Sequence, residues 1–569
     1  VNVVDDWKAT MMANSAKDPY WRAKVSHEIL INPGHATELE DKCTTCHAPM
    51  GHYQSKFEGD PHYGIADLVN DTLGLDGVSC AACHQQSAED LGLLFSGEIK
   101  FDTSRVIYGP YEMPFMGPMS SFVGFTPVYS EHINDAGICA GCHTLVTETS
   151  DLNGNPTGQT FVEQATYHEW LNSAYNGEKV GVSCQECHMP RIDDGVVISS
   201  NYLFLQPRSP FGQHTLVGAN TMMLQLMKDN KDALGLFATD ANFDSTLAST
   251  YDLLQHQTLD LDVQFQEIEN DTAFFQMDLV NLAGHKFPSG YPARRAFIEF
   301  LVVDSNQDTL FHTGRMDENW EILDQDPGFE PHHAVIRSED QVQIYEIINA
   351  DVNGDYTTVL ERAASALKDN RLTPLGFSTQ HSTYDTTAII GNASTDPNFN
   401  FANGVEGSGS DRIFFEIPLN GYTGMIDVKA RVWYQSLSPR FLAPMFTQNS
   451  TAINTFKSMF DNADNSPVLV SEELIDGIVV TNVESPEIAE NDLQVYPNPV
   501  MQDGWVRIDQ SKTPIQLIRI FNGAGQLIDQ FDHVQMPFSF RLPATSGLYI
   551  IEAIDVNNHR ISKKILRQP

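Results

Sequence analysis

The stretch Cys43-Thr44-Thr45-Cys46-His47 decides the class of this 569-residue chain, because the same pattern occurs three more times. The other copies are CAACH at Cys80–His84, CAGCH at Cys139–His143 and CQECH at Cys184–His188. The four copies use every cysteine of the chain: Cys43, Cys46, Cys80, Cys83, Cys139, Cys142, Cys184 and Cys187. One match would be a weak signal, but four matches that leave no cysteine over are a strong one.

The C-x-x-C-H spacing is the attachment pattern of c-type haem. Its two thiols reach the two vinyl groups on one porphyrin edge, and the following His places its imidazole beneath the iron. A redox dithiol or structural zinc would explain a single pair, but four zinc half-sites give no reason for a His after each. The sequence therefore predicts four covalently bound haems (heme c), with the proximal ligands His47, His84, His143 and His188.

Composition narrows the choice of partners and compartment. The chain holds 34 Lys and Arg against 75 Asp and Glu, a formal net charge of −41, which argues against nucleic-acid binding because phosphates would be repelled. No stretch approaches roughly 18 uninterrupted apolar residues, so no transmembrane segment is expected.

Covalent haem attachment takes place outside the cytoplasm. Because the numbering starts at Val1 without a Met, we also expect a processed chain.

The length exceeds the usual range of one domain, and the haem motifs all lie in the first part of the chain. We expect residues 1–225 to form a tetrahaem c-type cytochrome domain of short helices and long loops, with the haems supplying much of the core. Helical patterns cover Asp5–Leu30, with a break near Pro19, and Thr221–Leu234. The Met cluster in the second pattern is interpreted as core packing.

From about Leu259 the apolar period changes to two, which is typical of strands. Strands are predicted over Ala273–Leu282, Arg295–Val303, Val342–Ile348, Arg412–Pro418 and Met425–Gln435. Residues 226–484 are therefore predicted to combine a helical connection with an antiparallel β-sandwich. The acidic turn around Gly354 resembles a calcium loop, but it has no bidentate Glu at the EF-hand position, and a hairpin turn is preferred.

The end of the chain differs in charge from the rest. Residues 485–490 resemble a linker, and residues 491–569 carry eight Lys and Arg against seven Asp and Glu. Alternating apolar positions predict strands over Trp505–Ile508, Ile515–Phe521, Leu548–Ala553 and Arg560–Leu566. A separate, small Ig-like β-sandwich is expected.

The tail segments VYPNPV, IRIFNGAGQLI, LPATSGLYIIEAI and KKILRQ resemble the C-terminal sorting domain of the Por (type nine) secretion system. The resemblance covers about the last 75 residues, and the order of its motifs is specific. It implies secretion across the outer membrane, followed by release to the extracellular space or attachment to the cell surface. Removal of the sorting domain after export is left open.

The first 440 residues resemble a family of extracytoplasmic multihaem c-type cytochromes, loosely related to the tetrahaem electron-transfer cytochromes of ammonia oxidation. The motifs that carry the resemblance are CHAPM, DGVSCAACHQ, CAGCHTL, YHEWLNSAY, SCQECHMP, GHKFPSGYPARR and KDNRLTPLGF. The match is good in the haem part and fair in the β-domain. It implies electron transfer more directly than any named reaction.

A six-coordinate haem needs one distal ligand in addition to its proximal His. The resemblance favours His132, shortly before the third motif, His214, past the fourth, and His285, in a Gly/Pro-rich loop. The fourth distal ligand is left open among His27, His35, His52, His62 and His168. Met50 and His52 both follow His47 too closely to reach the opposite face of the same haem. Met50 is a weaker candidate for this reason, and His52 could serve a neighbouring haem.

Irons with imidazole on both faces exchange electrons without offering a substrate position. The first hypothesis is thus an extracellular electron carrier that meets redox partner proteins or extracellular electron acceptors, with no catalytic residue. A second is a multihaem oxidoreductase with one open-coordinate haem acting on a small nitrogen or oxygen species. In that enzyme, Arg294, Arg295 or His168 would act as a donor to the species bound at the iron. For the two arginines, an ion pair with a haem propionate is the preferred role. A third is a filament subunit with continuous haems.

Overall fold

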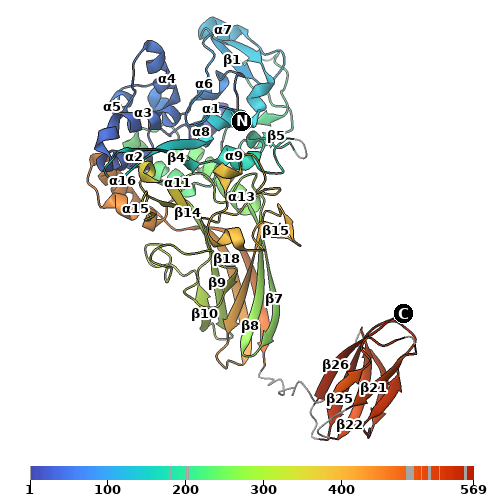
Figure 1. The fold of residues 1–569 in the computed structure, drawn as a ribbon. Helices are drawn as coiled ribbons and strands as arrows, with labels where there is room; N and C mark the ends of the chain where they lie inside the picture. The colour runs from blue at the N-terminus through green and yellow to red at the C-terminus, as the bar shows by residue number, and fades with distance from the viewer. Residues whose placement is uncertain are drawn as a thin grey trace. The chain divides into compact units, whose positions relative to one another are not determined.

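A computed structural model describes residues 2–177, 181–199, 201–202, 204–481, 493–501, 503–509, 514–523, 526–556 and 560–568. The chain divides into two compact units, Val1–Val480 and Thr481–Pro569 (Figure 1). Each unit has its own hydrophobic core. No helix among the described residues has the length and apolar character needed to cross a membrane.

The first part of the larger unit consists of short helices and loops around the four motifs. Each motif ends a helix with its His: α3 (Ala36–His47), α6 (Cys80–His84), α8 (Ala140–His143), which Cys139 directly precedes, and α10 (Cys184–His188). The other helices of this part are α1 (Val3–Trp7), α2 (Pro19–Ile31), α4 (Pro49–Glu58), α5 (Ile65–Leu68), α7 (Gly117–Phe122) and α9 (Thr166–Leu171).

The helical pattern over Asp5–Leu30 forms two helices, α1 and α2, with a non-helical segment between them. The second begins where expected: the Asp18 carboxylate accepts from the backbone N–H groups of Tyr20 and Trp21 at 2.8 and 3.2 Å, and Pro19 takes the first helical position. Short strands complete this part: β1 (Val106–Gly109) with β2 (Thr126–Tyr129), β3 (Leu145–Ser150) with β4 (Pro156–Gln164), and β5 (Arg191–Ile192) with β6 (Phe211–Gly212).

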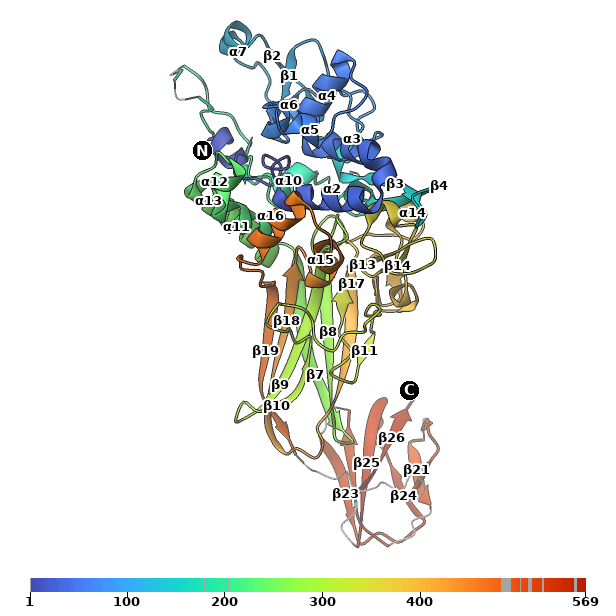
Figure 2. The ribbon, with the colours of Figure 1, turned by 90° about the vertical axis from the view of Figure 1, so that its left-hand side faces the viewer.

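Helices connect the motif part to the strands. The pattern over Thr221–Leu234 becomes α11 (Thr221–Asp229) and α12 (Lys231–Leu234), and α13 (Asp240–His256) follows. Met223 and Met227 are fully buried in hydrophobic clusters, which confirms core packing as the role of this Met group. Figure 2 shows these helices, with α15 (Pro439–Phe446) and α16 (Thr451–Phe460), between the motif part and one end of the strands.

Two sheets pack face to face in the larger unit. One has the order β10-β9-β18-β19, with β12 also pairing with β9, and the other has the order β11-β17-β8-β7. The long strands are β7 (Leu259–Glu269), β8 (Thr272–Asn281), β9 (Arg295–Asp304), β17 (Ser410–Pro418), β18 (Gly424–Gln435) and β19 (Val468–Val480). Their alternating inward residues form one continuous core, as the period of two predicts.

The structure departs from the expected strands at two places. The stretch Val342–Ile348 is divided between β12 (Ile344–Tyr345) and β13 (Ile347–Ala350), which pairs with β14 (Ser365–Asp369). A short β11 (Val335–Ile336) pairs in parallel with β17, so the sandwich is not entirely antiparallel. The acidic turn is a hairpin turn, because Asp351 Oδ1 accepts from the backbone N–H groups of the turn at 2.8 and 3.2 Å.

We expect Phe300→Ala to lower the free energy of unfolding of the larger unit by about 3–5 kcal/mol, because it leaves a cavity between the sheets. Phe300 is fully buried, stacks on Phe415 with ring centroids 4.0 Å apart, and meets the edge of Phe275 at 5.5 Å. Chemical denaturation followed by circular dichroism measures the change. Phe57→Ala, at a 74% exposed position, is the matched control and should change little. A loss below about 1 kcal/mol for Phe300→Ala would contradict this packing.

The smaller unit contains two antiparallel sheets, with the orders β20-β21-β24 and β23-β22-β25-β26 in its described residues. The strands are β20 (Gln494–Tyr496), β21 (Trp505–Asp509), β22 (Ile515–Asn522), β23 (Leu527–Asp532), β24 (Phe538–Arg541), β25 (Gly547–Asp555) and β26 (Arg560–Arg567). Ile508, Ile518 and Ile551 are among its fully buried core residues. The expected linker, residues 485–490, lies outside the described residues.

Candidate functional site

One large cavity runs through the motif part and has a volume of about 1890 Å³. All eight motif cysteines and all four motif histidines line it. Pockets for a drug-sized molecule span about 300–1,000 Å³, so this cavity has room for more than one such group. A single space thus joins four motifs that are spread over almost 150 residues of sequence.

None of the eight motif cysteines, all within the described residues, forms a disulfide. The thiols of Cys46 and Cys142 interact, which raises the pKa of Cys142. The thiols of Cys139 and Cys184 interact in the same way, which raises the pKa of Cys139. The first and third motifs, and the third and fourth, are therefore neighbours at their thiol edges.

The motif histidines are half-buried, and desolvation by the surrounding protein lowers the pKa of His47 and His143 to about 4. The pKa values of His84 and His188 are lowered for the same reason. His84 Nδ1 donates to the Tyr108 carbonyl at 2.6 Å, and His188 Nδ1 donates to the Val217 carbonyl at 2.5 Å.

A carbonyl oxygen can only accept, so these contacts fix the proton of both imidazoles on Nδ1. Nε2 is left with its lone pair, which is the form that binds a metal. His47 Nδ1 makes a longer contact of the same kind with the Ser15 carbonyl at 3.3 Å, and its ring stacks on Trp21.

Two further histidines face motif histidines across the cavity. The rings of His84 and His214 have centroids 6.3 Å apart and an interplanar angle of 19°. The rings of His188 and His285 have centroids 6.0 Å apart and an angle of 12°. Two imidazoles whose nitrogens lie about 2 Å from one metal, on opposite sides, have centroids about 6 Å apart. The centroid distances of both pairs match this spacing.

The same backbone contact orients the two facing histidines. His214 Nδ1 donates to the Gly212 carbonyl at 3.0 Å, and His285 Nδ1 donates to the Lys286 carbonyl at 2.8 Å. His214 follows β6, which pairs with β5 just past the fourth motif. His285 lies in the loop between β8 and β9, so the β-sandwich supplies it. The residues present fit haem in both places.

His132 lies differently from the other two favoured candidates. Its Nε2 donates to the Gln86 carbonyl at 3.0 Å, and its Nδ1 accepts from the Ser130 hydroxyl at 2.6 Å. Its ring meets the edge of Tyr108 at 4.7 Å. The ring contacts of the described residues do not pair His132 with a motif histidine.

The candidates for the fourth distal ligand occupy separate places. His35 lines the cavity. The helix α3 separates it from His47 by 12 residues, or about 18 Å, so it cannot bind the iron that His47 would hold. His27 and His52 are buried outside the cavity lining, beside Lys24 and Thr44 respectively. The other candidates do not line the cavity either: they are His62, His168 and Met50.

Arg294 lines the cavity, and its Nη1 donates to the Ser289 carbonyl at 2.7 Å. Arg295 instead points into the β-sandwich, where it forms an ion pair with Glu321 at 2.7 Å. The structure thus separates the two members of the Arg pair, and of the two Arg294 lies at the cavity.

A group of polar side chains in the cavity wall was missed by sequence reasoning. Tyr20, Glu163 and Tyr291 all line the cavity, and the two tyrosine rings meet edge to face at 6.0 Å. Neither hydroxyl makes a hydrogen bond of normal geometry. Burial raises the pKa of Glu163 to about 8, with a further contribution from the nearby Glu28. These residues come from distant segments without a shared motif, so no local signal could have joined them.

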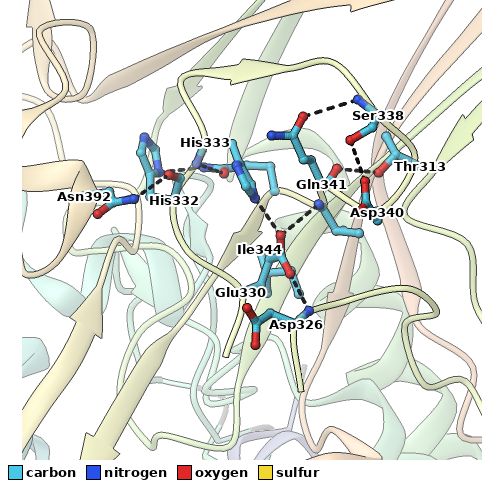
Figure 3. Close-up of polar contacts among 12 residues, drawn as sticks. Thr313, Asp326, Glu330, His332, His333, Ser338, Asp340, Gln341, Ile344 and Asn392 are labelled. Atoms are coloured by element: carbon cyan, nitrogen blue, oxygen red, sulfur yellow. Dashed lines mark hydrogen bonds and ion pairs between the residues drawn. The ribbon is translucent and has the colours of Figure 1, made fainter. Parts of the chain in front are cut away.

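A second polar group lies in the β-sandwich. His332, Asp396 and Asp411 are buried, and one ligand atom of each lies within 4.8 Å of the others. Figure 3 shows the surrounding loop, in which His333 contacts the Glu330 carboxylate at 2.6 Å.

Hydrogen bonds decide how this second group is protonated. The amides of Gln343 and Asn370 are fixed because their oxygens accept from backbone N–H groups, so their NH₂ groups donate to His332 Nδ1 at 2.7 and 3.2 Å. His332 Nδ1 therefore accepts, and the proton sits on Nε2, 3.1 Å from Asp396. Because Nε2 has no free lone pair in this arrangement, His332 does not offer a metal ligand, and the three side chains form a hydrogen-bond network in which Asp411 Oδ1 has no partner.

No protein-family model and no curated protein matches the chain. Among solved structures, it is similar to a penta-heme cytochrome c552 from Thermochromatium tepidum, with 16% identity and a TM-score of 0.45 over 84% of this chain and 96% of that one. HBP35 of Porphyromonas gingivalis is 13% identical, with a TM-score of 0.16 over 59% and 71%. Dimeric latent PorU from the same organism is 11% identical, with a TM-score of 0.12 over 55% and 34%. These likenesses do not place the chain in a family.

Proposed function

We propose that this protein is a multihaem c-type cytochrome that binds four haems covalently and carries electrons. The observation that supports this most directly is the single cavity lined by all eight motif cysteines and all four motif histidines. When bound, each haem supplies an iron that cycles between its ferric and ferrous states. The protein supplies attachment, axial ligands and separation from water.

The chain's own residues have distinct tasks in this proposal. Backbone carbonyls of Tyr108 and Val217 hold the rings of His84 and His188 with Nε2 toward the cavity. His214 and His285 would hold the same two irons from across the cavity, so that each of these haems would be bound by two histidines. The thiols of motifs one, three and four that interact with one another would bring the attached haems near enough for electrons to pass between them. His132 remains our candidate for a third distal ligand, a role that requires its Nε2 to leave the Gln86 carbonyl.

Mass spectrometry of the denatured protein is expected to show four haem additions on one chain. The variant with Cys80→Ala and Cys83→Ala removes both thiols of one motif and should carry three. Ala81→Ser changes the same motif without touching a thiol, so this control should keep four. Fewer than four additions to the unaltered chain, or zinc in their place, would rule the proposal out.

A second candidate function is that of an oxidoreductase with one open-coordinate haem. The observation in its favour is the group of Tyr20, Tyr291 and Glu163, which lines the cavity and in which the two tyrosine hydroxyls have no hydrogen-bond partner of normal geometry. Such groups can donate to a small nitrogen or oxygen species. Electron paramagnetic resonance separates the two functions, because an open-coordinate ferric haem is high-spin in the unaltered protein.

We further propose that the smaller unit is a sorting module for export, which would bring the cytochrome to the cell surface or the medium. Its sequence motifs support this, together with its charge balance and its separate core. There the four haems would pass electrons to redox partner proteins or extracellular acceptors. Copies of the protein could also assemble into a filament, which would place their acidic larger units next to one another.

A further inference from the structure

A buried network of four charged side chains lies next to the loop that carries His285. Lys286 Nζ pairs with Asp369 Oδ2 at 2.9 Å, and Arg371 binds both oxygens of the same carboxylate at 2.9 and 2.7 Å. Arg371 Nη1 also forms an ion pair with Glu169 Oε1 at 2.9 Å. All four side chains are at most 6% exposed. Two acids and two bases balance, so the network buries no net charge.

The network spans two parts of the larger unit that are far apart in sequence. Glu169 lies on α9, between the third and fourth haem motifs, whereas Asp369 ends β14 and Arg371 follows it. Lys286 lies in the loop between β8 and β9, one residue after His285. The network therefore joins the haem-motif part to the β-sandwich at the place where the sandwich supplies a ligand.

Glu169 also holds the backbone of this loop directly. Its Oε2 accepts from the backbone N–H of Lys286 at 3.2 Å and from the hydroxyl of Ser289 at 2.6 Å. On the other side, Asn281 Nδ2 donates to the His285 carbonyl at 2.8 Å. The peptide group that joins His285 to Lys286 is thus held from both sides, directly after the residue that must aim its Nε2 at the iron.

Stability alone is a weak reason for such an arrangement, because well-packed apolar residues in place of a buried ion-pair network are often as stable or more so. Fixed geometry is a better reason, since a charged network with directed hydrogen bonds admits one arrangement of its backbone. Resting on the function proposed above, we propose that Glu169, Lys286, Asp369 and Arg371 are positioning residues that hold His285 in place as a distal haem ligand.

Glu169→Gln tests this, because it removes the charge and one acceptor oxygen while keeping the size of the side chain. One of the four ferric haems should become partly high-spin by electron paramagnetic resonance and should take up cyanide, with four haems still attached. Amide hydrogen exchange at Lys286 and Phe287 should accelerate, which reports on the loop without relying on any activity.

Glu346→Gln is the matched control, because Glu346 forms another buried ion pair, with Lys368 at 3.1 Å. It should lower the melting temperature without creating a high-spin haem. If both variants give the same spin state and the same exchange at the loop, the positioning role is wrong. Should Glu169→Gln fail to fold, Ser289→Ala removes one contact to Glu169. An unchanged spin state and unchanged exchange in that variant would overturn the proposal.

His285→Ala, studied in parallel, separates this inference from the proposed function. If His285→Ala leaves every haem low-spin, His285 is not a ligand and the ligand assignment fails first. If His285→Ala produces a high-spin haem but Glu169→Gln and Ser289→Ala do not, only the positioning role fails.

Discussion

Replacing His285 by Ala is expected to convert one haem of four from low-spin to high-spin while all four stay covalently attached. The reason is the geometry across the cavity, where the His285 ring lies 6.0 Å from the ring of His188. Loss of the distal imidazole leaves the proximal His as the single protein ligand of that iron and favours the ferrous state. The midpoint potential of this haem should therefore rise.

Spectroelectrochemistry and electron paramagnetic resonance of the purified protein measure both changes. Cyanide should bind the variant at one haem per chain more than it binds the unaltered protein. His256→Ala is the matched control, because the His256 side chain is 69% exposed on α13. Four unchanged low-spin signals and unchanged potentials in His285→Ala would assign the loop a role other than ligation.

Ending the chain after Val480 is expected to abolish export while leaving the haem spectrum unchanged. The cut follows β19 and removes the whole smaller unit, whose described residues form a core of their own. The larger unit keeps its sandwich, its cavity and every haem motif. Cell fractionation in a host with the Por system should therefore find the shortened protein in the periplasm with four haems.

The complementary experiment fuses residues 481–569 to an unrelated periplasmic protein. A sorting module should direct this fusion across the outer membrane, whereas a module that only stabilises the cytochrome should not. Normal export of the shortened chain would contradict the role of the smaller unit in sorting. Loss of haem from it would show that the two units depend on each other.

Local patterns predicted much of the secondary structure. The expected strand Arg295–Val303 is β9 (Arg295–Asp304), and the expected strand Met425–Gln435 is β18 (Gly424–Gln435). Strands of this kind follow a period of two that depends on their own residues alone. The break before Pro19 could also be found locally, because a capping Asp and a Pro are adjacent in sequence.

Features that depend on distant contacts could not be predicted in the same way. The helices α15 and α16 were missed, although their apolar faces pack in the same hydrophobic cluster as Tyr20 and Met223. The ion pair of Glu169 with Arg371 joins residues about 200 positions apart. Glu169 lies in YHEWLNSAY and Arg371 in KDNRLTPLGF, but no local pattern shows that these two motifs meet. His132 is favoured by resemblance alone, and its ring nitrogens contact Gln86 and Ser130 in the structure.

The position of His285 in the β-sandwich has a consequence for the order in which the protein assembles. The loop that carries His285 leads directly into β9, and β9 pairs with β18, more than 100 residues later in the chain. Asp369 and Arg371, which hold the loop, also come late. Contacts of high sequence separation form slowly, so if His285 binds the iron of the fourth motif, that motif would gain its second imidazole only near the end of folding. Completion of that centre would thus report that the whole larger unit has been synthesised and folded.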